Sequence, residues 1–221
     1  MIRLDLEKAR YAQIMISKKA LDIDLFNYPP KYVGGVDVAF KSGYCIGAAV
    51  VLTFDDLRVV EKKHFITKVL IPYIPTYLAF REIHAMIGAV RRLETIPDII
   101  LVDAHGRMHP RRAGEATHLG VVLDIPTIGV AKSRLIGKER EDGFVVDDGE
   151  ILGYRLKPNI YISVGHRVSL ETAIKLVKKL TIYNIPEPTR QAHIYANEVK
   201  KRLDDYLRAK SSGTLSYYMN K

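Results

Sequence analysis

The chain has 221 residues, and 34 Lys and Arg against 25 Asp and Glu give a formal net charge of +9. With 48% hydrophobic residues, it can bury roughly 70% of its unfolded surface, so we expect a single domain over 1–221. The single cysteine, Cys45, excludes an intramolecular disulfide and a cysteine-rich metal site. The charged N-terminus and the lack of an apolar run near ~20 residues predict a cytoplasmic protein without membrane contact, which we expect to be monomeric.

The first half of the chain combines helical and strand patterns. Apolar residues at helical spacing predict a helix over 4–21. Three β-rich runs separated by turn residues then predict an antiparallel meander, with strands at 32–40, 45–54 and 58–66. A Pro-bracketed loop precedes a second amphipathic helix over 79–93.

The second half alternates helices with buried strands. A continuous apolar run predicts a strand over 97–102, and a helix at 116–123 followed by a strand at 126–130 suggests a parallel βαβ unit. Further along, the patterns predict a strand pair within 142–157, a strand at 160–164, helices at 169–180 and 189–206, and a mobile tail from Lys210. This order resembles ribonuclease H-like nucleases, so we expect an α/β fold with a mixed sheet flanked by helices.

Three carboxylates suit one site in such a fold. Asp37 lies in the middle of an apolar strand, and Asp103 ends a buried parallel strand, where α/β sheets carry their sites. Glu82 lies in the first turns of the helix between them. Three oxygen ligands suit Mg²⁺, and Mn²⁺ could substitute. The alternative is that Asp37 pairs with a buried basic residue and Asp103 caps a loop.

Basic and histidine side chains follow the second aspartate. The loop from His105 to Arg112 contains three arginines and no acid, which favours phosphate contacts over a merely solvated loop. His105 or His109 could orient water or substrate, and Lys132 follows the next buried strand. His193 lies one residue off the apolar stripe of its helix, where a histidine is more often structural.

Several motifs together resemble the endonuclease V family, in the family's order. They are Gly35-Val36-Asp37, Pro72-Tyr73-Ile74-Pro75, Leu78 to Glu82, Asp103 with His109-Pro110-Arg111, Thr117 to Gly120, Ile125 to Ser133, Gly165-His166 and Pro186 to Arg190. The resemblance implies metal-dependent hydrolysis of the second phosphodiester 3′ to a deoxyinosine, which leaves a 3′-hydroxyl and a 5′-phosphate. It therefore implies DNA containing deoxyinosine as the partner.

The resemblance also implies roles for individual residues. The family's metal carboxylates match Asp37, Glu82 and Asp103, and its C-terminal helix histidine matches His193. Its wedge matches 72–75, called the wedge loop below, in which Tyr73 with Pro72, Ile74 and Pro75 would hold the strands apart. The alternative for Tyr73 is packing under a crossover loop. His109 and Lys132 match positions near the flipped nucleotide and its phosphates.

The chain departs from the family pattern at two positions. Ala104 stands where the family usually has glycine, and Thr76 stands where glycine often follows the wedge loop. Both positions are expected close to the hypoxanthine base, so Ala104 could reshape the base pocket. Two other functions stay open: an endoribonuclease for inosine in single-stranded RNA, and a protein that binds altered nucleic acid without cutting it.

Overall fold

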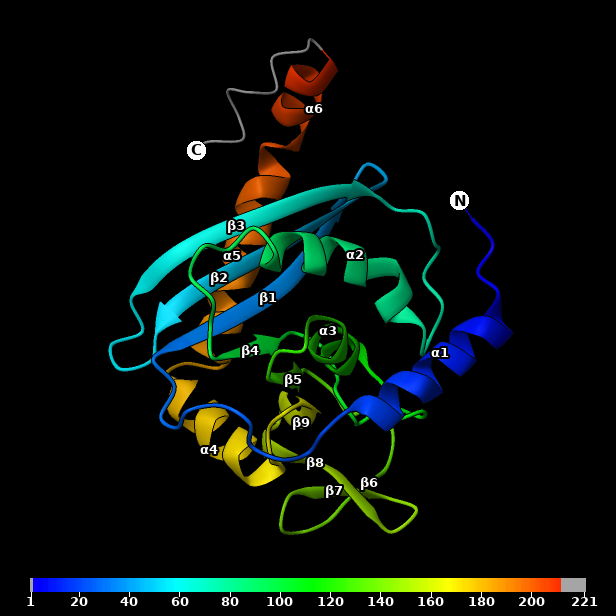
Figure 1. The fold of residues 1–221 in the computed structure, drawn as a ribbon, viewed down its shortest axis with the longest axis vertical. Coiled ribbons are helices and arrows are strands. Elements are labelled where there is room, and N and C mark those ends of the chain that lie inside the picture. Colours follow the sequence, from blue (N-terminus) through cyan, green and yellow to red (C-terminus); the bar gives the residue numbers. More distant parts are fainter. Residues whose placement is uncertain (1, 212–221) are drawn as a thin grey trace.

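A computed structural model describes residues 2–211, which form a mixed β-sheet with helices on both faces (Figure 1). The described strands form one nine-stranded sheet with the order β3-β2-β1-β4-β5-β9-β8-β7-β6. The strands are β1 Tyr32–Lys41, β2 Tyr44–Thr53, β3 Val59–Lys68, β4 Ile99–Val102, β5 Thr127–Ala131, β6 Lys138–Glu139, β7 Phe144–Asp147, β8 Glu150–Lys157 and β9 Ile160–His166. The predicted α/β class is confirmed.

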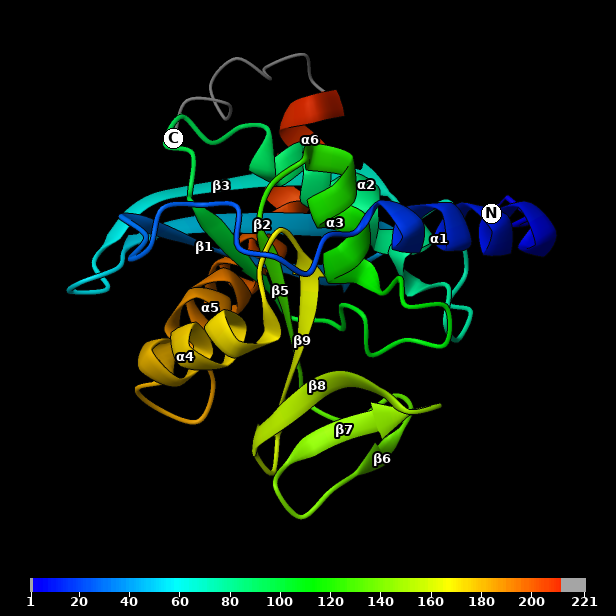
Figure 2. The same cartoon turned by 60° about the horizontal axis from the view of Figure 1, so that its bottom comes forward.

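The helices cover the sheet in two layers. Their bounds are α1 Leu6–Lys19, α2 Leu78–Val90, α3 Glu115–Leu123, α4 Leu170–Leu180, α5 Glu187–Lys201 and α6 Leu203–Ser211. Figure 2 shows α2 and α3 on one face of the sheet and α4 and α5 on the other. Each layer buries its own apolar cluster against the central strands, so the core has two halves separated by the sheet.

Parallel pairing at the centre of the sheet sets the positions of the predicted aspartates. Strand β4 is fully buried and lies parallel to β1, with Val102 opposite Val36. Asp37 and Asp103 each follow this matched pair by one residue. The backbone amide of Asp103 also donates to the carbonyl of Val36 at 3.2 Å, which continues the pairing. The register therefore brings the two aspartates to the same edge.

Glycines let helices approach the strands very closely. A Cβ at Gly35 would lie 1.9 Å from the carbonyl oxygen of Pro188, at the start of α5. A Cβ at Gly47 in β2 would lie 2.1 Å from the carbonyl oxygen of Ala85, in α2. Real side chains cannot approach a backbone so closely, so these glycines allow direct seating of both helices on the sheet.

The C-terminal helix differs from the prediction. A single helix through Tyr206 was wrong, because Arg202 separates α5 from α6. The amide of Arg202 donates to the carbonyl of Val199 at 3.0 Å, three residues back, which is a tight turn. The predicted tail begins at Lys210, within the bounds of α6, and its residues 212–221 lie outside the described part of the chain. No helix among the described residues is both long enough and apolar enough to cross a bilayer.

Candidate metal and nucleic-acid site

Asp37, Asp103 and His193 converge at the edge of the central strands. One potential ligand atom from each lies within 4.8 Å of the other two. Asp37 is only 7% exposed, and burial together with the negative charge of Asp103 raises its pKa. Such crowding of negative charge is costly without a cation, so the group has the character of a divalent metal site.

His193 reaches this group from α5, on the opposite side of the sheet from α2. Its Nδ1 lies 2.8 Å from Oδ2 of Asp37, and the side-chain amide of Asn197 donates to its Nε2 at 3.2 Å. Because Nε2 accepts, the ring proton resides on Nδ1 and is donated to Asp37. The helical spacing placed His193 beside the apolar stripe but could not show that α5 lies against β1.

Glu82 stands outside the 4.8 Å group but shares its electrostatic field. It is 7% exposed on α2, and burial raises its pKa, as do the charges of Asp37 and Asp103. Its carboxyl contacts that of Glu115, whose pKa burial raises still further. Burial therefore disfavours the ionisation of both carboxyls at once. Sequence reasoning missed Glu115 because an acid in the first turn of a helix is ordinary.

Lys132 neutralises the second aspartate. It follows β5, and its Nζ donates to Oδ2 of Asp103 at 2.7 Å. Burial alone would lower the pKa of Lys132, but the hydrogen bond and the charges of Asp103 and Asp37 raise it. The Lys132 side chain remains 62% exposed, so the same ammonium group faces solvent beside the aspartates.

A cavity of about 330 Å³, called the sheet-edge cavity below, opens next to the aspartates. It brings together residues from α1, the segment before α2, and the ends of β4 and β5. Its lining includes Asp103 and four of the residues predicted to bind substrate, namely Tyr73, Ala104, His109 and Lys132. Tyr73 is 62% exposed, which excludes the alternative that it packs under a loop. Pro72, Ile74 and Pro75 flank Tyr73 without lining the cavity.

His109 forms part of the cavity wall with both ring nitrogens engaged. The backbone amide of Arg111 donates to Nδ1 at 3.2 Å, so Nε2 carries the proton and donates to the carbonyl of Thr76 at 2.9 Å. Burial lowers the pKa of His109 to about 4, so the ring is neutral at pH 7. The ring nitrogens thus hold the segment after the wedge loop.

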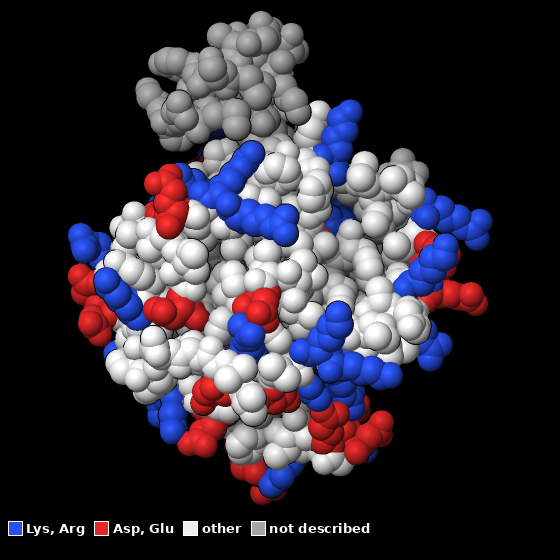
Figure 3. Space-filling model, viewed as in Figure 1, with Lys and Arg blue, Asp and Glu red and all other residues white. Residues whose placement is uncertain are grey.

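The three arginines of this loop, for which phosphate contacts were expected, all have intramolecular partners; Arg111 donates to the Thr76 carbonyl. Arg107 pairs with Asp22 and Glu150 at 3.1 and 2.7 Å, and Arg112 pairs with Asp147 and Glu150 at 2.9 and 2.8 Å. The acids come from distant segments, which the local sequence could not show. Figure 3 likewise shows basic and acidic side chains interspersed over one face of the molecule.

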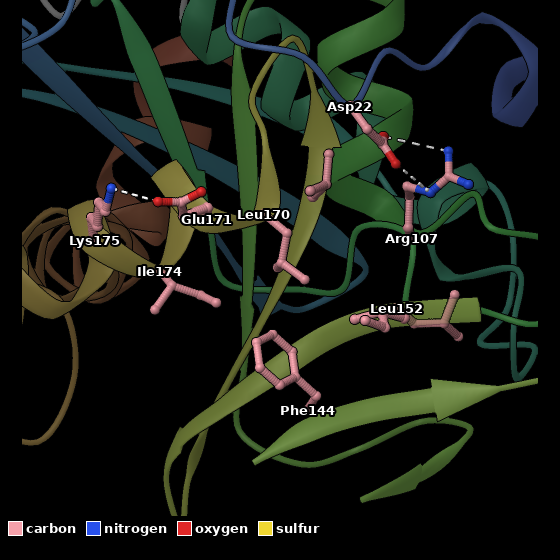
Figure 4. Close-up of a pocket in the computed structure, with 10 residues that line it drawn as sticks. Asp22, Arg107, Phe144, Leu152, Leu170, Glu171, Ile174 and Lys175 are labelled. Atoms are coloured by element: carbon pink, nitrogen blue, oxygen red, sulfur yellow. Dashed lines mark hydrogen bonds and ion pairs between the residues drawn. The ribbon is translucent and has the colours of Figure 1, made fainter. Parts of the chain in front are cut away.

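A larger cavity of about 570 Å³ lies away from the aspartates, between β7, β8 and α4 (Figure 4). Its wall is mainly apolar, with Phe144, Leu152 and Ile174 facing it. The pairs Asp22–Arg107 and Glu171–Lys175 border it. Within the described chain, its lining includes none of the residues predicted to hold the metal or the base, so size does not identify the functional cavity.

The central strand order, the two helix layers and the paired aspartates at the sheet edge define a ribonuclease H-like nuclease. The family within this class is given by similarity to known proteins. The family model described as Endonuclease V matches residues 15–194, and the chain belongs to the endonuclease V family. The predicted resemblance and the predicted nuclease activity are thereby confirmed.

Relatives match along most of their length. Endonuclease V of Thermofilum pendens is 43% identical over 86% of this chain and 87% of the relative, and that of Rippkaea orientalis is 45% identical over 85% and 88%. The crystal structure of endonuclease V from Streptomyces avermitilis has a TM-score of 0.84 at 34% identity, covering 91% of this chain and 96% of that one. Endonuclease V of Ciona intestinalis, in complex with a 24mer DNA containing an inosine followed by a ribo-adenosine, has a TM-score of 0.79 at 30% identity, covering 90% and 98%.

Proposed function

We propose that this nuclease nicks DNA at the second phosphodiester 3′ to a deoxyinosine and leaves a 3′-hydroxyl and a 5′-phosphate. One observation carries the proposal: Asp103 belongs to the candidate metal site with Asp37 and His193, and it also lines the sheet-edge cavity. A base held in the cavity would thus place its 3′ backbone beside the aspartates. The inosine-containing DNA bound by the Ciona relative supports this substrate.

The donor set fits a divalent cation. Asp37 and Asp103 offer carboxylate oxygens, the ligand type that Mg²⁺ and Mn²⁺ prefer, and burial together with the charge of Asp103 raises the pKa of Asp37. We assign the cation to these two residues; a cation bound there would favour the ionised form of Glu82, whose pKa burial raises to about 7. When bound, Mg²⁺ or Mn²⁺ would polarise the phosphodiester and ease ionisation of the attacking water.

The chain's own residues orient the reacting groups. His193 donates to Asp37 and holds that carboxylate in place, and Lys132 holds Asp103 while keeping its exposed ammonium group available to a phosphate. Tyr73, exposed at the mouth of the sheet-edge cavity, would stack in place of the extruded base. Extruding a mispaired base costs only a few kcal/mol, which one aromatic contact can largely offset.

Cleavage of matched duplexes tests the proposal. We expect Mg²⁺-dependent nicking of a duplex with one deoxyinosine and none of the same duplex with deoxyguanosine there. Asp37→Asn should abolish nicking while retaining preference for the inosine duplex in a binding assay. Equal cutting of both duplexes by the unaltered protein, or cutting of neither, would refute the proposed function.

An inosine-specific endoribonuclease is the second candidate. The ribo-adenosine after the inosine in the Ciona complex favours it, because that relative accommodates a 2′-hydroxyl 3′ to the base. Competition among strands carrying deoxyinosine–deoxyadenosine, deoxyinosine–riboadenosine and inosine–adenosine would separate the two functions. Preferred cleavage of the all-RNA strand would assign the protein to RNA.

A further inference from the structure

Thr76 has a conformation that a side chain seldom adopts. Its φ is +65°, in the left-handed region, where a residue other than glycine costs roughly 1–2 kcal/mol. The surrounding structure stabilises it, because its carbonyl accepts hydrogen bonds from Gln13 at 2.9 Å, His109 at 2.9 Å and Arg111 at 2.8 Å. The residue directly after the wedge loop is thus held by three separate donors.

Gln13 is central to this arrangement although it lies far away in the sequence. It is 1% exposed on α1, and its Nε2 donates to the Thr76 carbonyl while its Oε1 accepts from Nε of Arg111. Arg111 in turn donates from Nη2 to Oγ1 of Thr76 at 2.7 Å. Its guanidinium lies 4.4 Å from the centre of the Tyr77 ring. Figure 1 shows α1 next to the segment that joins β3 to α2.

An amide at this position is informative because an apolar side chain would suit a buried helix face better. Burying an amide is costly unless both its donor and its acceptor are satisfied. Here both ends are used, and they join α1 to the segment after the wedge loop and to the loop after β4. Gln13 also lines the sheet-edge cavity, with Tyr73 and Thr76.

We propose that Gln13 is a positioning residue that fixes the Thr76 carbonyl and thereby holds Tyr73 at the mouth of the sheet-edge cavity. Helix α1 is then part of the base-recognition apparatus. The proposal rests on the proposed function, in which Tyr73 replaces the extruded base. A prepositioned aromatic matters most when the inosine must be removed from a duplex, and matters less when the base is already unstacked in a single strand.

The first experiment compares Gln13→Ala with Ile16→Ala, which truncates a half-buried side chain on the same helix and leaves the Gln13 amide in place. For each, nicking is measured on a deoxyinosine duplex and on the same strand unpaired. Gln13→Ala removes about one hydrogen bond to the Thr76 carbonyl. We therefore expect the ratio of the nicking rate on the duplex to that on the single strand to fall roughly fivefold. We expect the ratio of Ile16→Ala to stay at the value of the unaltered protein. An unchanged ratio in Gln13→Ala would overturn the proposal.

A second measurement does not depend on catalysis. Amide hydrogen exchange over 74–77 should be about fivefold faster in Gln13→Ala than in either the unaltered protein or Ile16→Ala, because the carbonyl that anchors this segment loses a donor. Equal exchange rates would overturn the positioning role. If the unaltered protein cuts neither inosine substrate, the proposed function fails, and the exchange result still decides whether Gln13 holds the segment.

Discussion

Acid should destabilise the folded protein through His118, a buried histidine on α3. Its ring is 3% exposed and packs edge-on against Phe80, and burial lowers its pKa from 6.5 to about 4. The folded state therefore keeps the ring neutral, whereas the unfolded chain protonates it below pH 6.5. Because the unfolded chain binds the extra proton, this contribution is lost as the pH falls from about 6.5 to 4.

The two pKa values set the size of the effect. Lowering the pH from 7 to 5 should reduce the free energy of unfolding by about 2 kcal/mol per such histidine. Urea denaturation at both pH values measures this loss. His118→Gln, which cannot titrate, should show a loss smaller by about 2 kcal/mol. The control His84→Gln alters an exposed histidine on α2 and should keep the original loss. An equal loss in His118→Gln and the unaltered protein would refute the reasoning.

Three further substitutions test the site and its support. Asp103→Asn should lower the single-turnover nicking rate by more than about 100-fold, because losing a residue that merely orients a metal ligand already costs roughly 10- to 100-fold. A near-normal rate would mean that the metal binds elsewhere. Gly35→Ala should cost about 1–3 kcal/mol in thermal unfolding, because its Cβ would lie 1.9 Å from the carbonyl oxygen of Pro188; undiminished stability would contradict the close seating of α5. Thr76→Gly removes the backbone strain but also the hydroxyl contact with Arg111, and each effect is worth about 1 kcal/mol. The free energy of unfolding measured by denaturation should therefore change little, and a loss above about 2 kcal/mol would contradict this balance.

Hydrophobic periodicity predicted most of the fold because each central strand is buried in a regular pattern. The four buried residues of β4 and the meander of β1 to β3 follow directly from it. The proximity of Asp37 and Asp103 comes from the parallel register, in which Val36 lies opposite Val102. The two-residue strand β6 and the break at Arg202 have no comparable pattern, because local turn geometry sets them.

Contacts between distant segments account for what the sequence did not show. The sequence did not show the ion pairs of Arg107 and Arg112 with Glu150, because Glu150 lies 43 and 38 residues further along the chain. Gln13 is 63 residues from Thr76, and a glutamine in an amphipathic helix gives no sign of burial. Such roles depend on tertiary packing, and periodicity reports only which face of an element is apolar.

The hydrogen bond between Asp37 and His193 joins residues 156 positions apart in the chain. During synthesis, Asp37 and Asp103 emerge long before α5 does, so a nascent chain carries both carboxylates while the helix that orients one of them is still missing. A domain generally folds as a unit, so its site forms only once all of its segments have been made. The nuclease centre is therefore completed late in synthesis, and a chain truncated before α5 lacks the group that orients Asp37.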